Sequence, residues 1–144
     1  MDRPAPSAAA PFTWPVRIYY EDTDAGGVVY YANYLRYMER ARTEWLRALG
    51  WDQTGLAREF GILFIVRSAA IEYLRPGRLD DALAVTVEPH AGGASSLRLV
   101  QRVLRGGEEV ARGEVAVVCV NTETLRPVRI PAALVRLLGG MEQA

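Results

Sequence analysis

A single long helical pattern precedes four strand-like segments in this chain, and that order decides its fold class. Between residues 31 and 49, apolar side chains recur at the helical period and form a wide apolar face, at Leu35, Met38, Trp45, Leu46 and Leu49. Gly50 then offers a helix stop. Because the apolar face is wide, we expect this helix of about five turns to lie against or inside a sheet.

The segments that follow the helix have the pattern of strands joined by hairpin-like turns. Strands are expected at 62–74, 83–87, 95–105 and 109–120, and one more before the helix, at 16–20. Gly106-Gly107 suits a two-residue hairpin, and residues 90–93 are expected to form a turn. Short helices are expected at 52–60 and 131–138. The pattern predicts an α+β fold with one antiparallel sheet packed on a long helix.

The length of 144 residues suits one domain, which we expect at residues 14–138. The first 13 residues are rich in Pro and Ala and are expected to form a disordered tail. They lack the basic start and apolar core of a signal peptide, and no apolar run in the chain reaches membrane-spanning length. A single cysteine excludes an intrachain disulfide. We therefore expect a cytoplasmic protein without a membrane span.

Composition excludes several classes of function. Lys+Arg and Asp+Glu both number 17, and this zero net charge argues against nucleic acid as a partner. Every basic side chain is Arg, which excludes Schiff-base and Walker-type chemistry because both require a lysine amine. Cys and His are too few for a zinc site, so no metal is expected. The single histidine, His90, lies in an expected turn and the single cysteine, Cys119, in a valine-rich strand, so neither is expected to be catalytic.

An acidic, glycine-containing loop lies between the first expected strand and the long helix. It contains Asp22, Asp24 and the pair Gly26-Gly27. A helix N-terminus presents unpaired N–H groups that can polarise a carbonyl, and a nearby carboxylate can attack that carbonyl or activate a water. A thioester is reactive enough for this chemistry without a metal ion. The alternative is purely structural, with both aspartates serving only to cap turns.

The run Asp-Thr-Asp-Ala-Gly-Gly-Val-Val-Tyr at residues 22–30 is the most specific motif in the chain. It is accompanied by Trp14-Pro15-Val16-Arg17, Glu39-Arg40-Ala41-Arg42-Thr43-Glu44, Glu72-Tyr73, Arg78-Leu79-Asp80-Asp81, Ser96, Gln101-Arg102 and Val117-Val118-Cys119-Val120. Together these residues resemble the hotdog-fold acyl-CoA thioesterases of the 4-hydroxybenzoyl-CoA thioesterase type, closest to the bacterial branch associated with the Tol-Pal cell-envelope system. The resemblance covers about 14–138. It implies a five-stranded antiparallel sheet wrapped around a long central helix, with dimers joined sheet edge to sheet edge and tetramers built from them.

The resemblance also implies catalytic roles. The family's catalytic aspartate falls on Asp24 rather than Asp22. The backbone N–H of Tyr31 matches the group that polarises the substrate carbonyl. In the nearest branch this position usually holds His, so the chain departs from that branch at one active-site residue and has no imidazole there.

Pocket residues are implied in the same way. Phe64, Ile65 and Arg67 fall where the family places walls of the acyl pocket, partly across the dimer interface, and Tyr30 is a further candidate for that pocket. Ordinary strand or core packing is the alternative for the apolar ones. Arg67 lies in an otherwise apolar run and needs a partner, either a carboxylate or a CoA phosphate.

From these residues we expect an acyl-CoA thioesterase that hydrolyses a short-chain or aromatic acyl-CoA to free acid and CoA. Asp24 would be its nucleophile or general base. No cofactor is implied, since CoA is part of the substrate. A homotetramer is expected, with acyl carrier protein as a further candidate partner. Two alternatives stay open: a non-catalytic module that binds acyl thioesters or acyl carrier protein in cell-envelope maintenance, and a hotdog hydratase or dehydratase.

Overall fold

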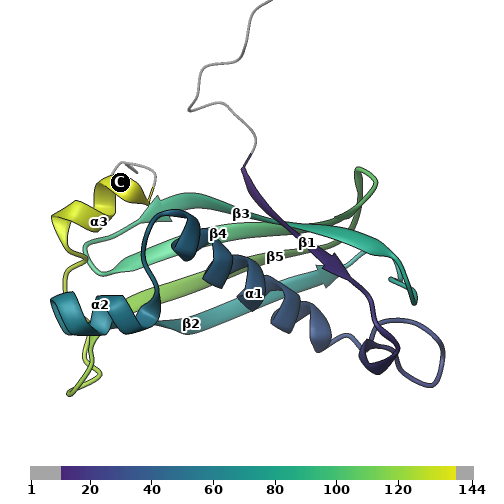
Figure 1. Ribbon diagram of the computed structural model, residues 1–144, viewed down its shortest axis with the longest axis horizontal. Helices are drawn as coiled ribbons and strands as arrows, with labels where there is room; N and C mark the ends of the chain where they lie inside the picture. Colours follow the sequence, from purple (N-terminus) through teal and green to yellow (C-terminus); the bar gives the residue numbers. More distant parts are fainter. Residues whose placement is uncertain (1–10, 139–144) are drawn as a thin grey trace, which may run out of the picture.

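The computed structural model describes residues 11–138. Its strands are β1 (Phe12–Arg17), β2 (Ile62–Tyr73), β3 (Ala82–Gly92), β4 (Ser96–Arg105) and β5 (Glu108–Asn121). Its helices are α1 (Asn33–Ala48), α2 (Gln53–Phe60) and α3 (Ala132–Leu137), with a 3-10 turn, η2, at Tyr20–Asp22. The strands form one antiparallel sheet in the order β1-β3-β4-β5-β2, and α1 crosses one face of it (Figure 1). The expected α+β architecture is confirmed.

The hydrophobic core lies between α1 and the sheet. The helix buries Tyr34, Tyr37, Met38 and Ala41, which recur at the spacing expected for one helix face. The facing sheet side chains come from alternate strand positions and include Val85, Leu97, Leu99, Val103, Val115 and Val117. Burying a side chain of this size is worth about 1.5–3 kcal/mol, so this interface holds the long helix in place.

One polar link crosses the centre of this core. The fully buried Gln101 donates through Nε2 to the backbone oxygen of Met38 at 3.0 Å and to that of Thr86 at 3.3 Å. Its Oε1 accepts from Arg42 Nη1 at 2.9 Å. Because these bonds satisfy the buried amide, Gln101 joins α1 to two strands without the cost of an unpaired polar group.

The first strand begins earlier than the sequence predicts. Phe12 and Thr13, expected in the tail, pair with Val87 and Thr86 of β3. The strand ends at Arg17, and residues 20–22 form η2 instead of continuing it. These differences arise because pairing with β3, 65 to 75 residues away in the chain, supplies backbone hydrogen bonds that local sequence does not reveal. The rest of the expected tail, residues 1–10, lies outside the described residues.

The expected turn at residues 90–93 is wrong in its position. Strand β3 continues through Gly92, and its pairing with β4 shifts register between Pro89 and Ala91. A bulge explains the continuity, because it accommodates a proline that cannot donate to the sheet ladder. His90 lies in this bulge, with Nε2 at 3.9 Å from a carboxylate oxygen of Glu88. Within residues 11–138, no helix is both long and apolar enough to cross a membrane.

Candidate active site

The segment that carries Asp24 folds as a tight hairpin. Thr23 pairs with Val29, and the Asp24 N–H donates to the Val28 oxygen at 2.8 Å. Gly27 closes the turn by donating its N–H to the Asp24 oxygen at 3.0 Å, with φ at +81°. A three-residue loop that ends in a left-handed residue favours glycine at that position. The hairpin therefore explains one glycine of the motif by backbone geometry.

The two aspartates of the motif lie in different surroundings. Asp24 is exposed, and its Oδ1 accepts the Gly26 N–H at 2.8 Å. Among residues 11–138, no N–H or O–H group donates to its other carboxylate oxygen. Asp22 is buried, and its Oδ2 accepts the Tyr19 N–H at 2.8 Å. Asp24 is thus an oriented carboxylate open to solvent, while Asp22 supports the local backbone.

Tyr31 follows the hairpin at a backbone turn. The Asn33 N–H donates to the Tyr30 oxygen at 2.8 Å, which makes Tyr31 the second residue of a four-residue turn that leads into α1. The Tyr30 N–H is occupied by the Asp22 oxygen at 2.9 Å. The Tyr31 N–H has no hydrogen-bond acceptor in the part of the chain that the structure describes. It is therefore a free donor two residues before α1.

Aromatic rings connect this turn to the far end of β2. The ring of Tyr31 lies 5.1 Å from that of Tyr30 and 5.8 Å, edge to face, from that of Tyr73. Tyr73 also lies 5.7 Å from Tyr34 of α1. Burial raises the pKa of Tyr73, and the neighbouring Tyr31 contributes. Contacts of this kind restrict the orientation of Tyr31, whose side chain is exposed over more than half of its surface.

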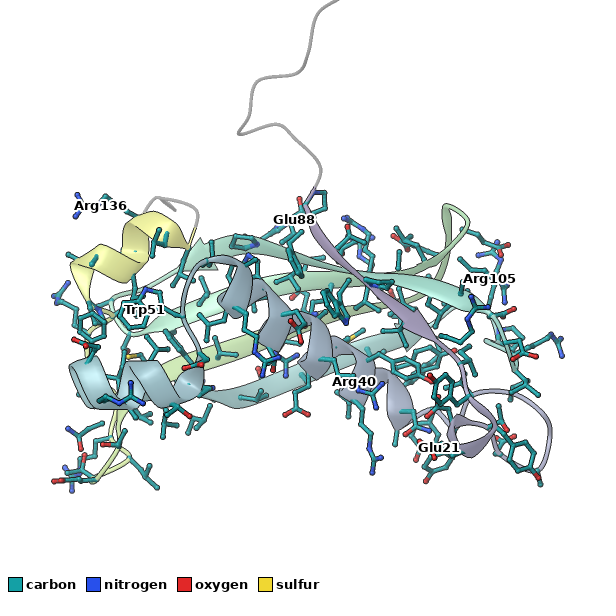
Figure 2. All side chains as sticks on the ribbon, in the orientation of Figure 1. Glu21, Arg40, Trp51, Glu88, Arg105 and Arg136 are labelled. Carbon is teal, nitrogen blue, oxygen red and sulfur yellow. The ribbon has the colours of Figure 1, made fainter. Side chains whose placement is uncertain are left out.

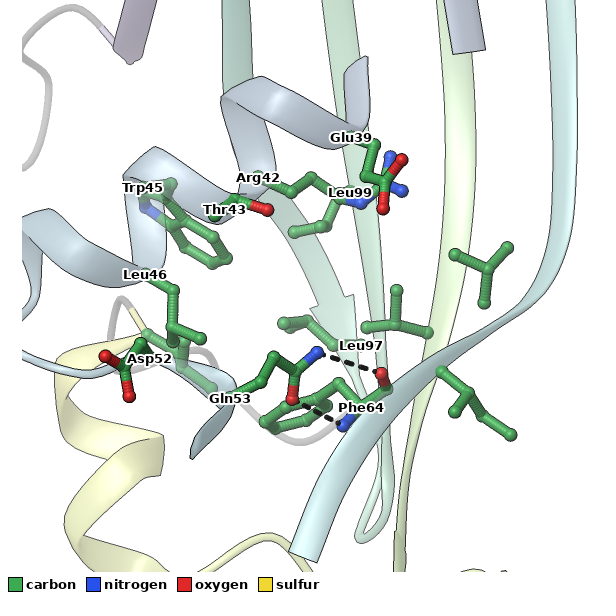
Figure 3. A pocket seen from close by; sticks show the side chains of 14 residues that line it. Glu39, Arg42, Thr43, Trp45, Leu46, Asp52, Gln53, Phe64, Leu97 and Leu99 are labelled. Atoms are coloured by element: carbon green, nitrogen blue, oxygen red, sulfur yellow. Dashed lines mark hydrogen bonds between the residues drawn. The ribbon is translucent and has the colours of Figure 1, made fainter. Parts of the chain in front are cut away.

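A hollow lies at the other end of the molecule. It has a volume of about 330 Å³ and is lined by Phe64 and Ile65 together with side chains from the second half of α1, such as Trp45 and Leu46 (Figure 3). Gln53 of α2 crosses it, donating to the Phe64 oxygen at 3.1 Å and accepting the Phe64 N–H at 3.3 Å. The apolar lining makes it the best candidate for an acyl pocket within residues 11–138.

The structure brings some of the expected site residues together and separates others. Tyr30 and Tyr31 follow directly on the Asp24 hairpin, at the end of the molecule where Glu21 lies in Figure 2, opposite the end that carries Trp51. Phe64 lies nine residues before Tyr73 on β2, a span of about 30 Å along a strand. One chain alone therefore does not bring Phe64 to Asp24.

Arg67 differs from its two expected neighbours. It lies at the shift in register between Val66 and Ser68, is exposed, and does not line the hollow. Among the described residues it forms no ion pair. Three residues that line the hollow were not indicated as pocket residues by the sequence: Trp45, Leu46 and Gln53. The helical period predicts that the first two face the sheet, but nothing local shows that Gln53 reaches Phe64.

The other reactive side chains offer little for catalysis. Burial raises the pKa of the Cys119 thiol to about 11, so this thiol stays protonated near neutral pH. In the range 11–138, no three His, Cys, Asp or Glu side chains gather closely enough to hold a metal ion. An oriented carboxylate, that of Asp24, and a free backbone N–H, that of Tyr31, are the two kinds of group that acyl transfer requires, and both belong to the same hairpin and the turn that follows it.

Comparison with known proteins identifies the family. The family model described as the thioesterase-like superfamily matches residues 18–138. The acyl-CoA thioesterase YbgC of Haemophilus influenzae is 43% identical over 120 residues, which cover 83% of this chain and 88% of that protein. The acyl-CoA thioester hydrolase YbgC of Escherichia coli is 44% identical over 125 residues, which cover 86% of this chain and 92% of that protein.

A solved structure supports the fold. The crystal structure of a 4-hydroxybenzoyl-CoA thioesterase variant with 4-hydroxybenzoyl-CoA superposes with a TM-score of 0.84 at 24% identity, covering 90% of this chain and 99% of that one. At that identity the likeness concerns the fold alone. Fold and site together define a hotdog protein of the thioesterase class. The chain belongs to the thioesterase-like superfamily, which confirms the family resemblance inferred from the motif at residues 22–30.

Proposed function

We propose that this chain is an acyl-CoA thioesterase that hydrolyses a short-chain or aromatic acyl-CoA, with Asp24 as its nucleophile or general base. The observation that carries the proposal is the Asp24 carboxylate, held by the Gly26 N–H at 2.8 Å and otherwise open to solvent. Two relatives of more than 40% identity that carry acyl-CoA thioesterase names support the choice of substrate class.

The chemistry follows from two groups. As a nucleophile, Asp24 attacks the thioester carbon, the C–S bond breaks, the thiolate leaves and takes a proton from solvent, and water hydrolyses the resulting anhydride. As a general base, Asp24 takes a proton from the water that attacks the same carbon, after which the C–S bond breaks and the leaving thiolate takes up that proton. In both routes negative charge develops on the carbonyl oxygen, and the free Tyr31 N–H, in the turn that follows the hairpin, is the donor that would stabilise it.

The proposal includes a second copy of the chain. Strand β2 is an edge of the sheet and exposes Ile65 and Val66 there, a combination that proteins avoid unless the edge is covered. Two β2 edges paired antiparallel about a two-fold axis near Ser68 would bring Phe64 of one copy beside Tyr73 of the other. Since Tyr73 contacts Tyr31, the acyl pocket of one copy would then face the hairpin of its partner.

Further parts of the proposal depend on the family resemblance. These are the tetramer built from such dimers, the cytoplasmic location, the link to the Tol-Pal system and acyl carrier protein as a partner. Tyr30, Ile65 and Arg67 enter as pocket residues on the same basis. Light scattering tests the assembly directly, because a monomeric mass for the active protein would contradict the composite site.

The deciding experiment measures thiol release across a panel of short-chain and aromatic acyl-CoA substrates. We expect hydrolysis by the wild type and a loss of about 100-fold or more in kcat for Asp24→Asn, with the fold retained. The matched control is Glu21→Gln, an exposed carboxylate three residues away, which should keep normal turnover. Near-normal hydrolysis by Asp24→Asn would refute the mechanism. A wild type that binds acyl-CoA without hydrolysing any of the panel would instead favour the non-catalytic alternative.

A further inference from the structure

Three chain segments lie side by side at the hairpin and form two rows of side chains. Val29 pairs with Thr23 on one side. On the other side, the Val29 N–H donates to the Gly77 oxygen at 2.8 Å. Val28 is bonded to Asp24 on one side and pairs with Arg78 on the other. Opposite residues in antiparallel pairs point to the same face, so Asp24, Val28 and Arg78 share one face.

The side chains of the second row show which way the first row faces. A Cβ placed on Gly77 would lie 3.1 Å from Val29 Cγ2 and 3.0 Å from Ile18 Cδ1, and both of these side chains are buried. The Thr23-Val29-Gly77 row therefore faces the core, and the row of Asp24, Val28 and Arg78 faces outward. With two strand spacings between them, the backbones of Asp24 and Arg78 lie about 10 Å apart.

Arg78 differs from the other arginines around this loop. Arg75 pairs with Glu108 at 2.9 Å, and Arg105 pairs with Asp81 at 2.8 Å. Arg17 donates to the backbone oxygen of Asp80 at 2.9 Å. Arg78 is exposed and, among residues 11–138, has no carboxylate within ion-pair distance and no hydrogen-bond acceptor for its guanidinium. The row thus ends in a cation available to a ligand.

The turn that presents Arg78 is rigidly held. The Arg78 N–H donates to Asp81 Oδ2 at 2.9 Å, and the Asp81 N–H returns to the Arg78 oxygen at 3.0 Å. Asp80 adopts a left-handed φ of +73° and donates its N–H to the Ile18 oxygen at 2.9 Å. A backbone ordered in this way before binding loses little further entropy when a ligand binds.

Given the proposed function, on which this step depends, we propose that Arg78 binds a phosphate of the substrate's phosphopantetheine-containing carrier. The thioester would lie at Asp24, the pantetheine arm would cross the half-buried Val28, and the phosphate would reach the guanidinium at the end of the row. A planar guanidinium suits a phosphate, since it can donate two parallel hydrogen bonds. The same chemistry occurs in CoA and in the prosthetic group of acyl carrier protein.

The test compares three thioesters of one acyl group: the acyl-CoA, its 3′-dephospho form, and the acyl-pantetheine, which has no phosphate. For Arg78→Ala we expect KM for acyl-CoA to rise about tenfold or more with kcat nearly unchanged, and KM for acyl-pantetheine to stay at the wild-type value. The matched control is Arg75→Ala, an exposed arginine of the same loop whose charge is already paired with Glu108. It should leave all three KM values unchanged.

Each outcome has a definite meaning. If the dephospho thioester shows the same loss as acyl-CoA, Arg78 contacts the pyrophosphate; if the loss disappears, it contacts the 3′-phosphate. Equal rises in KM for acyl-CoA and acyl-pantetheine, or no rise for either, would overturn the inference.

A separate binding measurement covers the case in which the wild type turns over none of the three thioesters and the proposed function fails. Calorimetry then decides the inference, because Arg78→Ala is expected to weaken CoA binding and to leave pantetheine binding unchanged. KM for an acylated acyl carrier protein, measured in parallel for the wild type and Arg78→Ala, shows whether recognition of that carrier also depends on Arg78.

Discussion

The phenol oxygen of Tyr34 accepts the Gly77 N–H at 3.1 Å and so joins helix α1 to the loop that borders the Asp24 hairpin. Gly77 also accepts the Val29 N–H at 2.8 Å, so the same residue contacts the hairpin from its other side. Burial raises the pKa of Tyr34 despite the hydrogen bond from Gly77, and the phenol stays neutral near pH 7. The position of the hairpin therefore depends on Gly77.

A methyl group at position 77 should displace these contacts. In Gly77→Ala the new Cβ would lie 2.8 Å from the Tyr34 oxygen, closer than real Cβ atoms approach, and 3.0 Å from Ile18 Cδ1, tighter than most real contacts. We expect the free energy of unfolding to fall by about 1–3 kcal/mol, measured by urea denaturation, and thioester hydrolysis to fall with it. Gly93→Ala is the control, because its nearest neighbour is the end of the flexible Ser96 side chain at 3.1 Å. Wild-type stability in Gly77→Ala would contradict the close approach.

Substitutions at the two aspartates of the motif should differ in their effect on the free energy of unfolding. Asp22→Ala removes a buried acceptor and leaves the Tyr19 N–H without its partner, so we expect a loss of about 1–3 kcal/mol in the free energy of unfolding. Asp24→Ala removes an exposed carboxylate whose partner, the Gly26 N–H, can turn to water, and its cost should stay below about 1 kcal/mol. Urea denaturation of both variants measures the difference. Equal losses would mean that Asp24 is also structural.

The sequence predicts those features that depend on neighbouring residues. The helical period of α1 is visible because Met38 and Ala41 face one core, and Gly27 is needed by the turn in which it lies. The pairing of Phe12 with Val87 depends on contacts across the whole chain, so β1 begins where local composition predicts a tail. The separation of Asp24 from Phe64 has the same origin, because only the packed fold shows that Tyr73, nine residues beyond Phe64 on β2, is the β2 residue that contacts Tyr31 after the hairpin.

Acid should destabilise the protein partly through Asp81. Burial opposes its ionised form, but the hydrogen bonds from Arg105 and the Arg78 N–H and the charges of both arginines outweigh burial and hold its pKa below the usual value. Because the pKa is lower in the folded state, ionised Asp81 stabilises the fold above its unfolded pKa of about 3.9, and this contribution is lost as pH falls through the folded pKa.

Urea denaturation between pH 7 and pH 2.5 measures that contribution. The wild type should be more stable than Asp81→Asn at neutral pH, and the difference should shrink in acid. Glu123→Gln, at an exposed carboxylate outside this network, is the control and should show no such trend. A difference between wild type and Asp81→Asn that stays constant across the range would contradict the linkage.

The buried thiol gives a simple probe of folding. Since burial raises the pKa of Cys119 to about 11, the reactive thiolate is scarce at pH 8 and the sulfur is also inaccessible. We expect iodoacetamide to modify the urea-unfolded chain quickly and the folded chain far more slowly, as measured by mass spectrometry. Similar rates in both states would mean that β5 opens readily.

The role of the Tyr31 N–H can be tested by comparing two variants that both lack the aromatic ring and differ in whether the N–H is present. Tyr31 is the second residue of the Tyr30–Asn33 turn, the position at which proline is favoured, and its N–H has no acceptor among residues 11–138. Tyr31→Pro should therefore fold while lacking the donor, and Tyr31→Ala should keep the donor while lacking the ring. If the N–H stabilises the developing oxyanion, kcat should fall about 100-fold in Tyr31→Pro and much less in Tyr31→Ala. Thermal melts of both variants confirm the fold, and equal kcat values in two folded variants would place oxyanion stabilisation elsewhere.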